Sequence, residues 1–124
     1  MRFTCKKEER LYGHASLEAV YNTGKHINNS CFKFIFLKVE DINEPPCRVV
    51  FSVPKRNFKK AVDRNRIKRQ MREAYRLHKQ LFYQQLSEKQ RQLHLYIIYT
   101  GKQLAEFSIL QDNLIKGLSS IVNK

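Results

Sequence analysis

The feature that most constrains the fold is the run CFKFIFLKVE at residues 31–40, whose side chains alternate between two faces of an extended chain. One face carries three aromatic residues, Phe32, Phe34 and Phe36. The opposite face is also largely apolar and carries Lys33, Ile35 and Leu37. Apolar residues on both faces are typical of a strand covered on both sides. The run therefore predicts a β-strand inside a layered structure of helices and sheet.

The rest of the chain predicts helices on either side of such strands. Helical spacing and a glycine stop predict a first helix over Ala15–Thr23, and CRVVFSVP at 47–54 predicts a second strand. The longest element is a helix from about Ala61 to about Gln85. LHLYIIYT at 93–100 predicts another strand. Leu110, Leu114, Leu118 and Ile121 predict a last helix, with a capping box at Ser108 and Gln111.

These elements predict one α+β domain over residues 1–124, an α-β sandwich in the order α-β-β-(β)-α-β-α. Residues 1–9 are expected to be flexible. No stretch approaches the roughly 18 apolar residues of a membrane span, and the N-terminus lacks the apolar core of a signal peptide, so we expect a cytoplasmic protein with no membrane partner. Cys5, Cys31 and Cys47 are scattered, which favours free thiols, and no metal-ligand spacing is visible.

The basic charge is concentrated in one part of the chain. The net charge is +13, and residues 55–79 hold eleven Lys or Arg against two acidic residues, which gives +9 of that total. A cluster of this kind indicates a polyanionic partner.

A helical wheel separates two faces of the long helix. At 100° per residue, a basic face spans about 0° to 140° and carries Arg64, Lys68, Arg72, Asn65, Arg76 and Arg69. An apolar stripe spans about 260° to 340° and is expected to dock on the sheet: Ile67, Met71, Ala74, His78 and Leu81.

The basic face could be a solvated surface or a binding surface. Like charges at Arg64, Lys68 and Arg72 repel one another, which a bound polyanion would relieve. Arginine matches phosphate oxygens with paired hydrogen bonds, and Asn65 suits a 2′-hydroxyl or a base edge. These features favour RNA over DNA. A membrane surface is disfavoured because the apolar stripe is committed to the core.

The segment AVDRNRIKRQMREAYR at 61–76 resembles the arginine-asparagine-arginine signature of the bacterial ribonuclease P protein subunit. The preceding RVVFSVPKR, the early RLYGHASLEAVYNTGK, the phenylalanine-rich strand and the late LHLYIIYTG are similar to that family as well, over roughly Arg10–Leu118. The resemblance implies an α-β sandwich with an unusual left-handed β-α-β crossover.

The resemblance also implies a function. The family's protein is the auxiliary, non-catalytic subunit of an RNA-catalysed endoribonuclease, a ribonucleoprotein that removes the 5′ leader of precursor tRNA. The implied partners are the catalytic RNA and precursor tRNA, and the implied cofactor is Mg²⁺ bound mainly by the RNA and substrate.

Two sets of site residues follow when the family's motifs are carried over position by position. The residues implied to bind the catalytic RNA are Arg64, Asn65, Arg66, Lys68, Arg69 and Arg72. The residues implied to line a cleft for the single-stranded leader are Leu17, Tyr21, Lys33, Ile35, Lys55 and Arg56.

Several positions leave alternatives open. Leu17 and Ile35 depart from the family's usual aromatic residues, and Leu17 and Tyr21 could equally be core residues. Arg66 lies outside the main basic face, so it either meets a different RNA strand or packs its stem on the protein. Phe58 and Lys59 replace a loop that often contains glycine. They either reshape the contact with RNA or cap an apolar edge.

The carboxylates do not form a visible catalytic group. Asp63 and Glu73, the acids of the long helix, are about 15 Å apart along its axis. We therefore predict no catalytic residue and no metal ligand in the protein itself. The alternative function is a ribosomal or ribosome-assembly RNA-binding protein with no part in an enzyme, and an autonomous nuclease is a weaker alternative.

Overall fold

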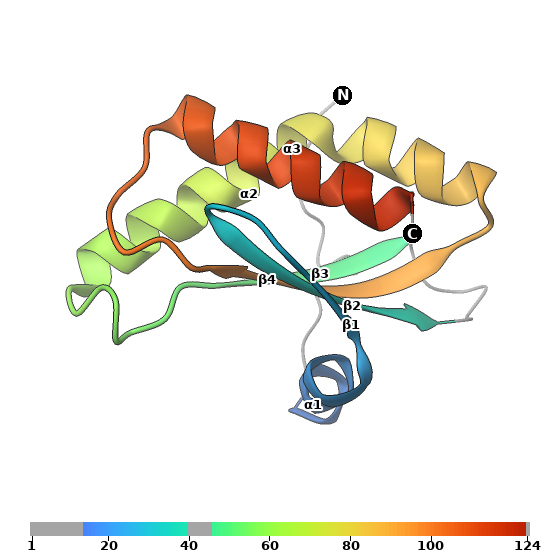
Figure 1. Cartoon of the computed structure of the whole chain (residues 1–124), viewed down its shortest axis with the longest axis horizontal. Coiled ribbons are helices and arrows are strands. Elements are labelled where there is room, and N and C mark those ends of the chain that lie inside the picture. Colours follow the sequence, from blue (N-terminus) through green and yellow to red (C-terminus); the bar gives the residue numbers. More distant parts are fainter. Residues whose placement is uncertain (1–13, 40–45, 124) are drawn as a thin grey trace.

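A computed structural model describes residues 14–39 and 46–123, and it shows three layers (Figure 1). A four-stranded sheet forms the middle layer, with α2 and α3 on one face and α1 on the other. The elements are α1 (His14–Thr23), β1 (Lys25–Asn28), β2 (Phe32–Val39), β3 (Cys47–Ser52), α2 (Ala61–Glu88), β4 (Gln92–Tyr99) and α3 (Phe107–Val122). The predicted α+β sandwich and its element order are confirmed. Residues 1–9, predicted to be flexible, lie outside the described part.

The sheet is mixed, with strand order β1-β2-β4-β3. β2 pairs antiparallel with both β1 and β4, whereas β3 pairs parallel with β4. Parallel neighbours cannot be joined by a tight turn, and α2 supplies the long crossover that such a pair requires. The left hand of this crossover stays a prediction that depends on the family resemblance.

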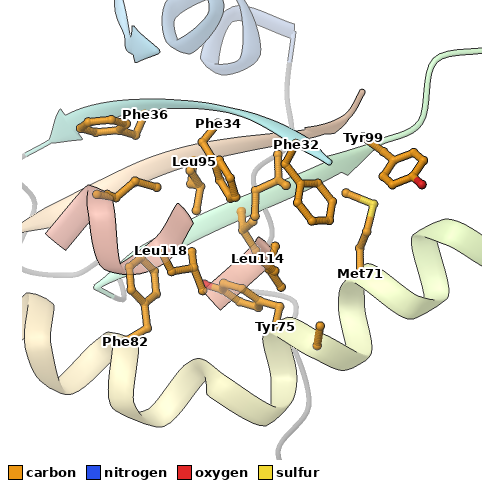
Figure 2. Packing of buried hydrophobic residues seen from close by; sticks show 14 of the residues in the cluster. Phe32, Phe34, Phe36, Met71, Tyr75, Phe82, Leu95, Tyr99, Leu114 and Leu118 are labelled. Carbon is orange, nitrogen blue, oxygen red and sulfur yellow. The ribbon is translucent and has the colours of Figure 1, made fainter. Parts of the chain in front are cut away.

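The core lies between the sheet and the two long helices. Phe32 and Phe34 of β2 point toward α2 and α3 in Figure 2, and with Phe36 they belong to one buried cluster that includes Met71, Tyr75, Phe82, Leu114 and Leu118. On the other face of the sheet, Ile35 is fully buried and packs with Val20 of α1. β2 is therefore covered on both faces, as its sequence predicts.

The buried face of α2 differs in part from the predicted stripe. Ile67, Met71 and Ala74 are buried as expected, but Leu81 is 48% exposed and its assignment to the core is wrong. His78 is half-buried, and this burial lowers its pKa from the usual range. The second half of the helix buries Tyr75, Lys79, Phe82 and Leu86. Successive buried residues along α2 are more often four positions apart than three. Because an α-helix has about 3.6 residues per turn, the buried face therefore turns gradually around the helix axis.

Two local predictions also need correction. β1 was not located from the sequence, because KHIN offers only Ile27 as a core side chain. The predicted capping box is wrong, since α3 begins at Phe107 and its N-cap, Glu106, makes no side-chain cap bond.

Cys31 and Cys47 are free thiols, as expected. Among the described residues, no helix has the length and apolar character needed to cross a membrane.

Gly117 marks the closest approach of α3 to the sheet. A β-carbon at this position would overlap the ring of Phe34. A glycine in a helix interior normally costs stability, so its position here follows from packing: only a residue without a side chain lets α3 lie directly on the aromatic face of β2.

We expect Gly117→Ala to destabilise the domain by up to about 2 kcal/mol. Overpacking typically costs about 1–3 kcal/mol, which outweighs the gain of about 1 kcal/mol in helix propensity. Urea unfolding measures the difference, with the exposed Lys116→Ala as the control that should stay within about 0.5 kcal/mol of the parent. A Gly117→Ala domain at least as stable as the parent would contradict this packing argument.

Candidate nucleic-acid interface

The basic residues in the first half of α2 lie outside its buried stripe, whereas Lys79 in the second half is buried. Asn65, Arg66, Arg69 and Arg72 are exposed, whereas Arg64 and Lys68 are half-buried. The difference follows from position on the helix, because Arg64 and Lys68 lie closest to the buried stripe on the helical wheel. Five of these residues belong to the basic face predicted from the sequence and Arg66 lies beside it; from here on, we call the six together the basic face of α2. All six lie in its first twelve residues, since the helix begins at Ala61.

Arg76 extends the basic face in the sequence, but in the structure it is paired within the helix. Its Nε donates to Glu73 Oε2 at 2.9 Å, and its Nη2 donates to Glu73 Oε1. The hydrogen bond from Arg76 lowers the pKa of the Glu73 carboxyl. The strongest unneutralised charge on this side of α2 is therefore near the start of the helix.

Arg64 also forms hydrogen bonds within the protein, in its case to backbone carbonyl oxygens. Its Nη1 donates to the carbonyl oxygens of Phe58 at 2.7 Å and Lys59 at 2.9 Å. The side chain therefore turns back toward the loop that precedes α2, and only part of its donor capacity remains for another molecule.

A groove lies on the opposite face of the sheet, beside the end of α1. It has a volume of ≈ 470 Å³ and is lined by Tyr21, Lys33, Pro54, Arg56, Asn57, Ile98, Thr100 and Lys102. Among the described residues, the lining combines one aromatic ring with three cationic side chains and no acidic side chain. Such a surface suits an anionic ligand that carries flat rings, as single-stranded nucleic acid does.

The strand register explains why these residues meet. Lys33 of β2 is paired with Ile98 of β4, and Ser52 at the end of β3 is paired with the same Ile98. Because β3 and β4 run parallel, the segments that follow them leave the sheet at one edge, as Figure 1 shows. Pro54–Asn57 and Thr100–Lys102 therefore meet there, and the end of α1 supplies Tyr21.

The structure brings together half of the predicted cleft residues. Tyr21, which is 53% exposed, Lys33 and Arg56 all line the groove. Lys55 is exposed in the loop beside it but does not line it. Ile35 has no exposed surface, so it lies beneath α1 as a core residue with no access to a ligand.

Leu17 belongs to α1, but its side chain lies outside the described part of the structure. Sequence reasoning missed five of the lining residues: Pro54, Asn57, Ile98, Thr100 and Lys102. For all of them except Ile98, which lies within β4, a signal was available: residues just beyond the carboxyl ends of neighbouring parallel strands commonly form ligand sites.

Burial decides between the two alternatives for the loop in which Phe58 and Lys59 replace residues that often include glycine in the family. Phe58 is 7% exposed and its ring centroid lies 5.9 Å from that of Tyr99, so it closes the edge of the apolar core. Lys59 is exposed and adds positive charge beside the start of α2. Of the two alternatives, capping an apolar edge describes Phe58.

The described residues contain no group of three or more His, Cys, Asp or Glu side chains that could hold a metal ion. What residues 14–39 and 46–123 offer is a set of cationic, amide and aromatic groups on two neighbouring surfaces. Such groups can bind and orient RNA.

Comparison with known proteins identifies the family. The family model described as Ribonuclease P matches residues 5–122. The chain belongs to the ribonuclease P protein family. The ribonuclease P protein component of Porphyromonas gingivalis is 30% identical over 119 residues, covering 96% of this chain and 87% of that protein. That of Chlorobium phaeobacteroides is 31% identical, covering 94% of this chain and 86% of that protein.

Solved structures of ribonuclease P proteins share the fold. The protein from Thermotoga maritima superposes with a TM-score of 0.71 at 23% identity, covering 89% of this chain and 94% of that one. The protein from Staphylococcus aureus gives 0.68 at 22% identity, covering 91% and 94%. The resemblance seen in the sequence is therefore confirmed, and the ribosomal alternative is not favoured.

Proposed function

We propose that this chain, as the protein component of ribonuclease P, binds the catalytic RNA through the exposed residues of the basic face of α2 and the 5′ leader of precursor tRNA in the groove. The observation that carries the proposal is that the groove and the basic face meet at one loop. Pro54–Lys60 leaves β3, supplies Arg56 and Asn57 to the groove, and leads directly into Ala61 of α2.

The groove has the chemistry that a variable single strand needs. An aromatic face accepts any base, because every base has a π-surface, and stacking on it is worth roughly 1–3 kcal/mol per base. Tyr21 is the exposed aromatic residue of the groove, while Lys33, Arg56 and Lys102 provide cations for the phosphates.

The basic face of α2 has the chemistry that a folded RNA needs. Exposed arginines bind phosphate oxygens through planar paired donors, and Asn65 adds a donor and an acceptor for a 2′-hydroxyl or base edge. The face is rigid, because the opposite side of the same helix is anchored in the core by Ile67 and Met71.

Catalysis is assigned to the RNA partner in this proposal. The side chains of the described residues do not fit a protein-held Mg²⁺ site, since no cluster of carboxylates or imidazoles is present among them. We therefore place the Mg²⁺ on the catalytic RNA and its substrate, and we assign the protein the tasks of binding and orienting.

Reconstitution tests the proposal as a whole. The purified chain should leave precursor tRNA intact, and the chain with its cognate catalytic RNA at near-physiological Mg²⁺ should release the leader faster than that RNA alone. Gel analysis of 5′-labelled precursor measures both. Cleavage by the RNA-free chain, or no acceleration in the complex, would refute the assignment.

Tyr21→Ala should weaken precursor tRNA binding to the holoenzyme about 5–30-fold, which corresponds to about 1–2 kcal/mol of lost stacking. Mature tRNA, which lacks the leader, should bind within about twofold of the parent. Equilibrium binding of the two tRNAs to assembled holoenzyme measures the ratio. Ile109→Ala, which removes a similarly exposed side chain from α3 on the far side of the sheet, is the control. Equal weakening of both tRNAs by Tyr21→Ala would remove Tyr21 from the leader site.

A further inference from the structure

Arg64 has a geometry that differs from that of an ordinary RNA-binding arginine. One nitrogen, Nη1, donates to two consecutive backbone carbonyls, Phe58 O at 2.7 Å and Lys59 O at 2.9 Å. The nitrogen carries two hydrogens, so both bonds can be made at once. Charge-assisted bonds of this kind are stronger than neutral ones. The guanidinium therefore links the first turn of α2 to the end of the preceding loop.

The linked loop is the one that walls the groove. Arg56 and Asn57 line the groove, and the Asn57 N–H donates to Pro54 O at 3.3 Å in a turn. Phe58 anchors the middle of the loop in the core. Beyond Phe58, the bonds from Arg64 fix the backbone that enters α2. The two groove residues thus lie between a turn at Pro54 and a double anchor at Phe58 and Lys59.

The start of α2 has no side-chain cap, although the acidic Asp63 in the first turn interacts favourably with the helix dipole. Lys60 occupies the N-cap and makes no side-chain cap bond. A cation in the first turn is also unfavourable with respect to the helix dipole, whose positive end lies there. The two carbonyl bonds offset that cost for Arg64, because they place its charge against two partial negative charges.

From this geometry we infer that Arg64 is a positioning residue: it holds loop 54–60 so that Arg56 and Asn57 face the groove, and it thereby couples the basic face of α2 to the leader site. The inference depends on the proposed function only for the identity of the ligand. It separates Arg64 from Arg69 and Arg72, whose exposed side chains lie farther along the same helix.

The test compares Arg64→Met with Arg69→Met, since each removes one positive charge from the same helix. Hydrogen exchange of the free protein comes first. In Arg64→Met, the amides of Asn57 and Asp63, which donate to the carbonyl oxygens of Pro54 and Lys60, should exchange at least tenfold faster than in the parent, whereas Arg69→Met should leave their exchange unchanged. Unchanged exchange in Arg64→Met would overturn the inference.

Binding measurements on the assembled complex come second. Arg69→Met should lower the log–log salt slope of catalytic-RNA binding by roughly one unit, the value for one lost phosphate contact. It should also keep the preference for precursor over mature tRNA. Arg64→Met should lower the precursor preference at least fivefold and change the salt slope by less than half a unit. If Arg64→Met instead reproduces the Arg69→Met pattern, Arg64 is an RNA contact and the inference fails.

Arg64→Lys distinguishes positioning from general loss of structure. A lysine keeps the charge and some donor capacity, so loop protection and precursor preference should both lie between those of the parent and Arg64→Met. If the protection of the loop from hydrogen exchange and the preference for precursor tRNA change independently across the parent, Arg64→Met and Arg64→Lys, the coupling is overturned. If the parent complex shows no precursor preference, the leader site of the proposed function fails, and the exchange result alone then decides whether Arg64 holds the loop.

Discussion

The parallel pairing of β3 with β4 is the constraint from which the functional geometry follows. A parallel pair needs a long connection, so the chain between the two strands must cross one face of the sheet, and α2 makes that crossing. The same pairing makes both strands end at one edge of the sheet. The loop that enters α2 and the loop that leaves β4 meet at that edge, where they close the groove around Lys33 and Tyr21.

The two faces of the sheet differ in how closely they are covered. The face toward α2 and α3 is filled by aromatic rings in close contact, such as Phe32 and Tyr99 with centroids 5.7 Å apart. The face toward α1 is only partly covered, so side chains such as Lys33 and Ile98 remain accessible. Rigidity and ligand access are thereby assigned to opposite sides of the same strands.

Much of this architecture was predictable because strong periodic patterns specify it. The alternation in β2 and the long basic helix were located from the sequence almost to their ends. β1 was missed because a four-residue edge strand carries too little apolar signal. Leu81 was assigned to the core because a straight wheel assumes a constant direction of burial, whereas the buried stripe of α2 turns along its length.

The site was predictable only in part, and for a different reason. Tyr21, Lys33 and Arg56 could be proposed from the family resemblance, but Thr100 and Lys102 enter the groove through strand register, which composition does not reveal. The hydrogen bonds from Arg64 to backbone carbonyls were equally hidden, because any arginine in a basic run has the same appearance in sequence. Burial likewise separated Ile35 from the ligand-accessible residues beside it.

The groove is formed by four segments that are far apart in the chain: the end of α1, β2, the loop after β3 and the end of β4. It therefore does not exist in the unfolded protein. Any ligand that binds it adds to the free energy of unfolding by an amount that grows with ligand concentration. For a chain that carries a net charge of +13 and repels itself when compact, a polyanion bound in the groove would therefore stabilise the folded state.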